Sequence, residues 1–572
     1  ALPGGDPLAA ALALGETPSP EMVAAAGSKT GMKPKYAVAC LLSIVIGLIL
    51  IAVLNRQTGL IQRAPLTHSP EVLASKARTM IAQLGWPDPP YDTSYGMRQD
   101  WPYFNFIEAQ TKPSDRWKVL LGGTYGPVHF WYRENTDYLV STRRRYSGAV
   151  NLSDPPTNSP GMKTIDLDSA GNLREFQAVP VDFEEIKKEG GASPPPAPNW
   201  ERLFTLAGLD PTQFTATTPQ WTPRQVFDAR AAWMSNAQAS FSFALRIEAA
   251  TYQGRVVDFR VMGPWDQPKQ ELRQSRFWLR VANWVLEGLI VAVFLFGGWL
   301  AFRNFRHGRG DRRGAVRLGL FIALMELFTW FFSASHIPSL DELGLLAQAV
   351  KDALFWGGFL GMVYLAMEPY VRRVWPTTLI SWQRIVNGRG RDPLVGQEVL
   401  IGISVAIVSG VVFRLYDWKL GTISDRSFPA SLLGGRYLIA DLCSGLGLGL
   451  SVPIGMFFLL FLLRVMLKRN WLAIVGLTLL FCGPMITFRP AFEMLIYLVF
   501  YSLVFTLAIR YGAVCYIALM FDPGFGLLTT DTAAWYFSSS LIIACVVLAV
   551  AAYAFHMALG GQKVFSGKLL EE

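Results

Sequence analysis

Long apolar segments separated by short arginine-rich loops fill the second half of this chain and limit what it can fold into. A helix that crosses a bilayer needs roughly 20 apolar residues in a row, and runs of about this length recur from residue 282 onward. A first such run occupies residues 36–54. Further membrane spans are predicted near 282–302, 315–333, 344–366, 396–414, 436–463, 471–488, 491–509, 511–529 and 533–557.

The overall composition agrees with a membrane protein. The 572 residues are 51% hydrophobic and 17% charged, and soluble domains rarely average so apolar over such a length. A formal net charge of +9 could suggest nucleic-acid binding, but the arginines are concentrated between apolar segments. Positive charges in such loops hold them on the cytoplasmic side of a membrane. We therefore expect the lipid bilayer as a partner and no nucleic acid.

The placement of the charged loops predicts the orientation. The loop 303–317 contains six arginines and one aspartate, and the loop 368–392 is also rich in arginine. The loop between them, 334–343, holds Asp341 and Glu342 and neither lysine nor arginine. This alternation places both termini in the cytoplasm and residues 57–276 outside. Both termini can lie on the same side with ten spans but not with nine, so ten spans are favoured. The segment 491–529 could form either two spans or one bent helix.

The predicted fold class is a polytopic α-helical membrane protein of about ten spans, with an extracytoplasmic α+β domain inserted between the first and second spans. No cysteine lies between Arg56 and Arg276, so a disulfide framework is excluded there. The predicted organisation is a cytoplasmic juxtamembrane linker at 1–35, the first transmembrane helix at 36–54, the extracytoplasmic region at 57–276, the polytopic membrane domain at 282–559 and a cytoplasmic tail at 560–572.

The linker and the external region contain local structure signals. In the linker, Ser19 followed by Pro20 predicts the start of a short helix. Helix and hairpin patterns on both sides of a proline-rich break suggest one α+β region or two related modules. The external elements expected are helices over 70–84, 200–208 and 223–234, a strand or strand pair over 128–140, hairpins over 162–181 and 245–262, and the break at 190–198.

Ionisable residues inside predicted spans are candidate functional residues, because each costs about 2.5–3.5 kcal/mol at the bilayer centre on insertion scales. Glu326 lies in the third span, Lys351 and Asp352 in the fourth, and Asp441 in the sixth. A pair between Glu326 and Lys351 would form either a proton or ligand site or a structural link between two helices. Asp441 would line a cavity or stabilise helix packing. No metal-binding or cofactor-binding residue is predicted.

Two further patterns leave alternatives open. Aromatic residues are frequent between Trp86 and Tyr132, where they would line a groove for an unknown extracytoplasmic ligand or build the domain core. Gly357 and Gly361 form a small-xxx-small pattern, which packs helices within one chain or joins two chains in a homodimer.

Three stretches resemble one protein family. They are the linker sequence Leu2-Pro-Gly-Gly-Asp-Pro-Leu-Ala-Ala continuing to Gly15-Glu-Thr-Pro-Ser-Pro-Glu-Met-Val-Ala, the loop Glu368-Pro-Tyr-Val-Arg-Arg-Val-Trp-Pro continuing to Gly396, and Thr529-Thr-Asp-Thr-Ala-Ala-Trp-Tyr. These stretches resemble the linker and membrane region of acidobacterial-type transmembrane serine/threonine protein kinases. The resemblance runs from the linker to the last helix and implies a multi-pass protein of the bacterial inner (plasma) membrane.

The chain departs from that family in having no catalytic motif. A protein kinase needs a glycine-rich loop, a strand lysine, a catalytic-loop aspartate and an Asp-Phe-Gly sequence. None occurs here, and no other catalytic residue is predicted, so whether the chain is an enzyme stays open. The resemblance implies a kinase domain, with its ATP and Mg²⁺, upstream of Ala1. Because the first residue is not methionine, a fragment or a processed product is expected.

Two functions follow as hypotheses. In the first, the chain is the sensory and anchoring portion of a transmembrane serine/threonine kinase, which signals from an external domain to a cytoplasmic kinase domain. In the alternative, it is a transporter or channel domain with an external accessory domain. A transporter is expected to have broken helices in matching halves and to gather Glu326, Lys351 and Asp441 near the bilayer midplane.

Overall fold

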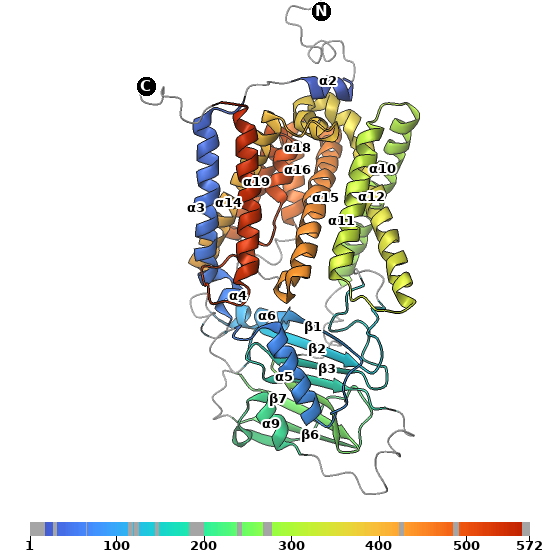
Figure 1. Ribbon diagram of the computed structural model, residues 1–572, viewed down its shortest axis with the longest axis vertical. Helices are drawn as coiled ribbons and strands as arrows, with labels where there is room; N and C mark the ends of the chain where they lie inside the picture. The colour runs from blue at the N-terminus through green and yellow to red at the C-terminus, as the bar shows by residue number, and fades with distance from the viewer. Residues whose placement is uncertain are drawn as a thin grey trace, which may run out of the picture.

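The computed structural model consists of a helical bundle with a β-sheet domain at one end (Figure 1). The first helix of the bundle runs from the opposite end down to the sheet domain, and the chain returns to the bundle through α10 (Phe277–Arg306). The structure describes residues 18–26, 31–64, 66–111, 118, 120, 125–142, 148–181, 199–236, 243–266, 277–422, 428–483 and 491–562.

Long apolar helices make up the bundle. Within the described ranges, seven helices are long and apolar enough to cross a membrane, so the predicted polytopic helical protein is confirmed at this level. These seven are α3 (Pro34–Thr58), α11 (Arg312–Ser333), α12 (Asp341–Val374), α14 (Pro393–Leu420), α15 (Gly435–Leu467), α17 (Ala491–Tyr511) and α19 (Phe537–Leu559). The 30-residue helix α10 stands at the predicted second span.

Two of the ten predicted spans are not long helices within the described residues. The helix α16 (Asn470–Cys482) covers 13 residues, and α18 (Ala513–Met520) covers only eight. Gly512, with φ +106°, separates α17 from α18. Beyond α18 the chain leaves the helix, apart from the short 3₁₀ turn η6 (Phe525–Leu527). The predicted span 511–529 is therefore half helix and half unwound chain.

The bundle has two ends, which carry different parts of the chain. At one end, which we call the linker end, the amide of Met32 donates to the carbonyl of Ala558 over 2.7 Å, so the start of α3 meets the end of α19. The short helix α2 (Pro20–Ala25) lies at this end (Figure 1). The predicted cap is confirmed, because the Ser19 hydroxyl accepts a hydrogen bond from the amide of Met22 over 3.1 Å. The other end, which carries the sheet domain, is the sheet end.

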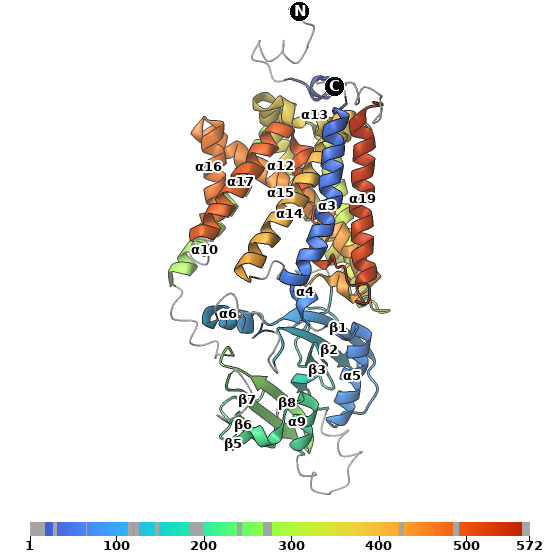
Figure 2. The same cartoon turned by 90° about the vertical axis from the view of Figure 1, so that its left-hand side faces the viewer.

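The sheet domain contains one antiparallel sheet of eight strands in the order β1-β2-β3-β4-β8-β7-β6-β5. Figure 2 shows the strands stacked one below another, with β1 nearest the bundle and β5 farthest from it. The elements are α4 (Leu60–Arg63), α5 (Pro70–Gln83), β1 (Asp92–Gln99), α6 (Trp101–Gln110), β2 (Val128–Asn135), β3 (Lys163–Asp168), β4 (Leu173–Ala178), α9 (Glu201–Ala207), η1 (Pro211–Gln213), β5 (Phe214–Thr217), β6 (Ala229–Ser235), β7 (Arg246–Tyr252) and β8 (Arg255–Met262).

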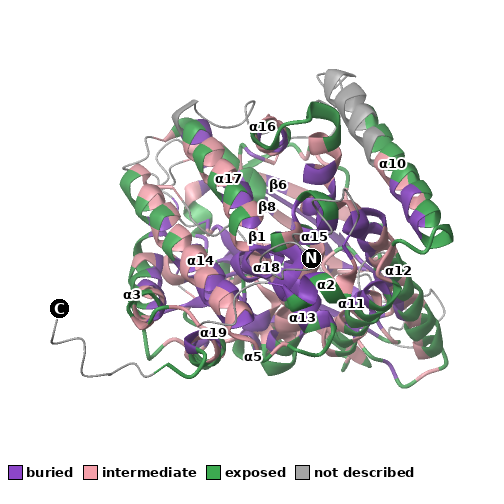
Figure 3. Ribbon diagram, turned by 90° about the horizontal axis from the view of Figure 1, so that it is seen from above, coloured by how far each residue is buried: buried purple, intermediate pink, exposed green. Residues whose placement is uncertain are grey.

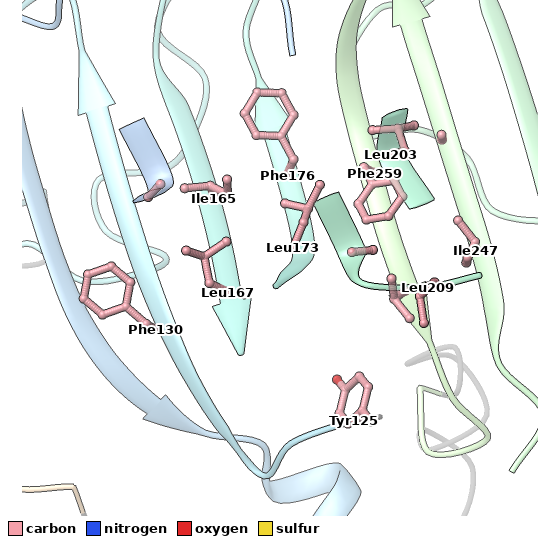
Figure 4. Close-up of a cluster of buried hydrophobic side chains, with 14 of the residues drawn as sticks. Tyr125, Phe130, Ile165, Leu167, Leu173, Phe176, Leu203, Leu209, Ile247 and Phe259 are labelled. Atoms are coloured by element: carbon pink, nitrogen blue, oxygen red, sulfur yellow. The ribbon is translucent and has the colours of Figure 1, made fainter. Parts of the chain in front are cut away.

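The sheet has two similar halves. Each half begins with a helix, α5 or α9, and continues with four antiparallel strands that pair in chain order. The last strands of the halves, β4 and β8, pair at the centre of the sheet, where Phe176 lies opposite Phe259. Both phenylalanines are fully buried. Figure 4 shows them among core residues from both halves, including Ile165, Leu167 and Ile247. The two halves therefore share one core.

Among the described residues most of the elements predicted for 57–276 are present, but one prediction was wrong. The proline-rich break at 190–198 lies outside the described residues. The expected helix over 223–234 is a non-helical segment followed by β6. The alanines of β6 suit a helix, but pairing with β5 on one side and β7 on the other satisfies its backbone on both edges. Strand β1 was missed because its residues alternate little in polarity. Helix α6 was missed although Asp100 caps it and Pro102 lies in its first turn.

The sheet domain packs directly on the bundle. Leu66, Met97 on β1 and Phe428 contact both the core of the sheet and the buried cluster formed by α3, α14 and α19. A second contact joins the loop after β2 to the α11–α12 hairpin, because the amide of Ser335 donates to the carbonyl of Gly148 over 3.3 Å. The sheet domain thus touches both the first helix and the hairpin.

Replacing Phe176 with alanine is expected to destabilise the sheet domain by about 3–5 kcal/mol, because a fully buried ring leaves a cavity between the two halves. Proteolysis of the sheet domain during thermal unfolding of the purified chain measures this loss of stability. Val226, which is 61% exposed, supplies a control, since Val226→Ala should change stability by less than about 0.5 kcal/mol. Equal effects of the two substitutions would contradict the shared core.

Candidate functional site

The linker helix α2 lies against the bundle at the linker end. It packs on η3 (Pro376–Leu379) and α13 (Ile380–Val386), which follow α12 in the chain. The side chain of Val23 is fully buried there, in one cluster with Trp375 and Ile380. Figure 3, which views this end, shows α2 and α13 over the centre of the bundle with buried residues around them. The linker is therefore docked on the membrane domain.

Arg384 on α13 holds the end of α2. Its guanidinium donates to the carbonyl of Ala24 over 3.1 Å and to the carbonyl of Ala26 over 2.7 Å. A third hydrogen bond reaches the Asp392 carboxylate over 2.5 Å. Carbonyls at the end of a helix have no partner within the helix and carry partial negative charge. Because the Arg384 side chain is only 4% exposed, this contact satisfies those carbonyls away from water.

A second polar cluster lies beside this dock and joins α12, α13 and the α10–α11 loop. The Glu368 carboxylate accepts hydrogen bonds from Arg372 over 2.7 Å and from Gln383 over 3.3 Å. Arg372 also donates to the carbonyl of Arg309 over 3.0 Å. All three side chains, Glu368, Arg372 and Gln383, are buried. Removing one partner of such a buried pair leaves an uncompensated charge, which typically costs about 3–5 kcal/mol, so the cluster fixes α13 relative to the α10–α11 loop.

Glu398, near the start of α14, links α13 to α18. Its carboxylate accepts a hydrogen bond from the Ser381 hydroxyl over 2.5 Å, and it faces the backbone amides of Val514 and Cys515 at the start of α18. A carboxylate is stabilised at the positive end of a helix. Gly512 packs so closely on Glu398 that an added Cβ would lie 2.6 Å from a carboxylate oxygen. Glycine is therefore needed at the break between α17 and α18.

At the sheet end, Asn55 near the end of α3 holds the unwound segment after α18. Its amide nitrogen donates to the carbonyl of Phe525 over 3.0 Å and to that of Leu528 over 2.8 Å. Arg414 donates to the Asn55 side-chain oxygen over 2.6 Å, and Gln62 donates to the carbonyl of Gly526 over 2.9 Å. Non-helical backbone in an apolar bundle is tolerated where such partners satisfy it. The helix α3 is therefore fixed at both ends.

The stretches that carry the family resemblance meet at these sites. Linker residues 18–26 contact the loop 368–396 through α2 and α13, although the two lie more than 340 residues apart. The third stretch, 529–536, lies at the sheet end, where the Trp535 indole donates to the carbonyl of Leu66 over 3.2 Å. The resemblance marked these stretches, but the sequence did not reveal that two of them touch.

The predicted intramembrane residues do not form one cluster. Lys351 contacts Gln348 over 2.8 Å and lies 3.9 Å from Asp352 on its own helix. Across the described ranges Glu326 makes no hydrogen bond or ion pair, so the expected pair with Lys351 is not formed, although Glu326 lies within electrostatic range of Asp352. Asp441 accepts from the amide of Ser431 over 2.8 Å, in the turn η4 (Ala430–Leu433).

Sequence reasoning missed Arg384, Glu368, Glu398 and Asn55. Two signals were available. Glu368 and Arg372 are four residues apart on one helix, a spacing that brings opposite charges together, and Glu398 is an acid just inside a predicted span. Nothing in the sequence shows that Arg384 binds the linker, because that contact joins residues about 360 positions apart.

The polar side of the sheet carries a buried ionisable cluster. His129 lies 2.6 Å from the Asp166 carboxylate, and Arg98 donates to the same carboxylate over 2.7 Å. Burial alone would raise the pKa of Asp166, but His129 and Arg98 outweigh it and the pKa is lowered. Asp266 behaves oppositely. Burial, together with the nearby charges of Asp100 and Glu175, raises its pKa to about 6. The Gly263 amide and His129 act to lower the pKa but do not offset this rise.

The aromatic residues predicted to form either a groove or a core are mainly core. Trp86, Tyr103, Phe130 and Tyr132 are buried in the cluster shared by the two halves of the sheet, and Trp86 donates its indole N–H to the carbonyl of Val256 over 2.8 Å. Trp101 and Tyr91 remain exposed. Most of these aromatic residues therefore build the core of the domain and do not line an open groove.

Comparison with protein-family models, with curated proteins and with solved structures finds no match to this chain. In the part of the chain that the structure describes, no group of three or more His, Cys, Asp or Glu side chains is placed to hold a metal ion.

Replacing Arg384 with alanine is expected to release α2. Hydrogen bonds to charged groups contribute about 1.5–3 kcal/mol each, so thermolysin cleavage before the buried Val23 should accelerate by roughly 10- to 100-fold. The exposed Arg389, five residues further along the chain, supplies the matched control, and Arg389→Ala should leave the cleavage rate unchanged. Equally slow cleavage in wild type and Arg384→Ala would contradict the docking contact.

The raised pKa of Asp266 predicts a pH-dependent stability. A carboxyl whose folded-state pKa is raised stabilises the fold below its ordinary pKa, and this contribution is lost as the pH rises through about 6. Asp266→Asn should therefore raise stability at pH 8 by about 1–2 kcal/mol, with the gain falling towards zero near pH 4. Thermal unfolding at several pH values measures this, with the exposed Asp88→Asn as control. A gain independent of pH would contradict the assignment.

Proposed function

We propose that this chain is the sensory and anchoring portion of a bacterial transmembrane serine/threonine protein kinase. On this proposal the chain spans the inner membrane several times, with the sheet domain outside and both termini in the cytoplasm. The external domain responds to an extracytoplasmic ligand, and the response reaches a kinase domain that precedes the linker. The arginine-rich loops at the linker end support this orientation.

The observation that carries the proposal is the docking of the linker. In the family that this chain resembles, the segment corresponding to α2 follows the catalytic domain directly. Here Arg384 binds the end of α2, and α3 runs from this end to the sheet domain (Figure 1). A displacement of the sheet domain would move the sheet end of α3, and the same rigid helix would transmit the movement to the linker. Such coupling requires two states of the dock, with Arg384 bound or released.

The geometry gives less support to a transporter or channel. The unwound segment after α18 resembles the broken helices of transporters, but Asn55 and Gln62 already bind three of its carbonyls, those of Phe525, Gly526 and Leu528. In transporters such carbonyls are offered to an ion. The expected midplane cluster of Glu326, Lys351 and Asp441 is also not formed, as Asp441 binds the amide of Ser431 instead.

The coding sequence upstream of Ala1 tests the proposal. We expect an open frame that encodes a glycine-rich loop, a strand lysine, a catalytic-loop aspartate and Asp-Phe-Gly in that order. The protein encoded by the longer frame, reconstituted in vesicles, should transfer phosphate from ATP. Arg384→Ala should change that rate at least threefold, whereas Arg389→Ala should not. A start codon near Ala1 with no such frame would contradict the proposal.

A further inference from the structure

An apolar cavity of about 520 Å³ lies inside the helical bundle between α10, α12, α15 and α16. Its walls include Phe294 and Gly297 on α10, Phe359 on α12, Gly455 on α15 and Phe481 on α16. For comparison, an apolar cavity of about 150 Å³ holds benzene. By proportion this cavity has room for roughly 15–20 carbon atoms.

Two glycines, Gly297 and Gly455, keep the cavity open because they place no side chain in it. A Cβ added at Gly455 would meet no atom within 4 Å, so the backbone of α15 forms a bare wall there. At Gly297 an added Cβ would lie 3.2 Å from the ring of Phe458. Across the cavity, Phe294 and Phe359 stack with ring centroids 4.0 Å apart and join α10 to α12. The space is thus bounded by fixed aromatic rings and by glycine backbone.

The lining offers almost nothing to a polar ligand. Among the lining residues, only Ser451 and Trp356 have an O–H or N–H group on the side chain. The Ser451 hydroxyl donates to the carbonyl of Gly447 in its own helix over 2.8 Å. A charged or strongly polar ligand would lose its hydration here without gaining partners. The chemistry of the cavity therefore selects hydrocarbon.

The cavity also opens towards the surroundings of the bundle. Three of its lining residues, Trp356, Leu448 and Leu480, are 42–59% exposed. Two of them belong to α12 and α15, which are long and apolar enough to cross a membrane. Large apolar side chains exposed on such helices face the hydrocarbon of the bilayer. The compound that reaches this opening at highest concentration is therefore a membrane lipid.

The position of α10 gives such a lipid a structural consequence. Among the described elements, α10 packs extensively only on α12, and Figure 3 shows it at the rim of the bundle. On its other side lies a second apolar crevice of about 600 Å³, lined by residues of α10, α11 and α12. With apolar space on both sides, the position of α10 depends on what fills the cavity.

We propose that this cavity is a binding site for one acyl chain of a membrane phospholipid, which holds α10 against α15 and α16. The chain enters from the bilayer between α12 and α15, and its end lies against Gly455 and Phe481. The phospholipid headgroup stays in the interfacial region and contributes little to selection. This site does not depend on the proposed signalling role of the chain.

Photolabelling with a phospholipid that carries a diazirine within one acyl chain tests the site in vesicles. After irradiation, mass spectrometry compares adducts on cavity residues with adducts on Leu541 of α19, which is 52% exposed and reports bulk lipid. We expect at least fivefold more adduct per residue on Phe359 and Phe481 than on Leu541. An equal or smaller yield would overturn the proposal, because the cavity would then exchange freely with bulk lipid or stay empty.

Gly455→Phe supplies the second arm, since the ring would enter open space and fill the cavity from α15. The matched control is Gly358→Phe, because a Cβ there also meets no atom within 4 Å but this residue lines the other crevice. Gly455→Phe should reduce cavity labelling at least fivefold, and Gly358→Phe should leave it unchanged. Unchanged labelling in Gly455→Phe would overturn the site. If either variant fails to fold, the wild-type ratio to Leu541 still decides.

Discussion

The need to satisfy backbone carbonyls away from water governs two contacts on which the arrangement of this bundle depends. Each unpaired polar group buried in an apolar environment costs several kcal/mol. At the linker end, Arg384 satisfies the carbonyls that α2 leaves open. At the sheet end, Asn55 satisfies those of the unwound segment after α18. Both contacts join segments hundreds of residues apart, so the tertiary arrangement depends on them.

These contacts make α3 a rigid connection between the two ends. The helix packs against α14 and α19, and the Asn55 contact fixes its sheet end. Its linker end is fixed by the hydrogen bond between Met32 and Ala558. Beyond that point lies α2, which has only six residues. Isolated helices of this length are unstable in water, so α2 depends on the surface formed by η3 and α13. The folded state of α2 is therefore coupled to the structure of this surface.

How much the sequence predicts depends on the range of the interactions involved. The apolar runs predict most bundle helices, because crossing a bilayer requires a minimum length of apolar residues. Ser19 and Pro20 predict the start of α2, since capping is local. Prediction from the sequence fails where strand pairing or helix contacts depend on residues far apart in the chain. The alanines of β6 suggest a helix until β5 and β7 are in place. The predicted span 511–529 loses its helix after α18, where Asn55 and Gln62 from another part of the chain bind its carbonyls.

The same division applies to the candidate residues. Ionisable side chains within apolar segments, such as Glu326 and Asp441, are visible in a sequence, but whether they meet is decided by helix packing. Arg384 lies in an arginine-rich loop, and in sequence it looks like any other charge that orients the loop. Its burial and its two carbonyl partners distinguish it from the exposed Arg389. That distinction requires the fold.

Hydrogen exchange at the amides of Val23 and Ala26, measured on the unmodified chain in bilayers, tests the central claim most directly. The Val23 amide donates to the carbonyl of Ser19 at the start of α2, and the Ala26 amide donates to that of Met22 at its end. A free six-residue helix would not protect them. Docking predicts that both exchange at least 100-fold more slowly than an unstructured peptide of the same sequence. Exchange at the rate of the free peptide would show that the linker is not held by the membrane domain and would contradict the account.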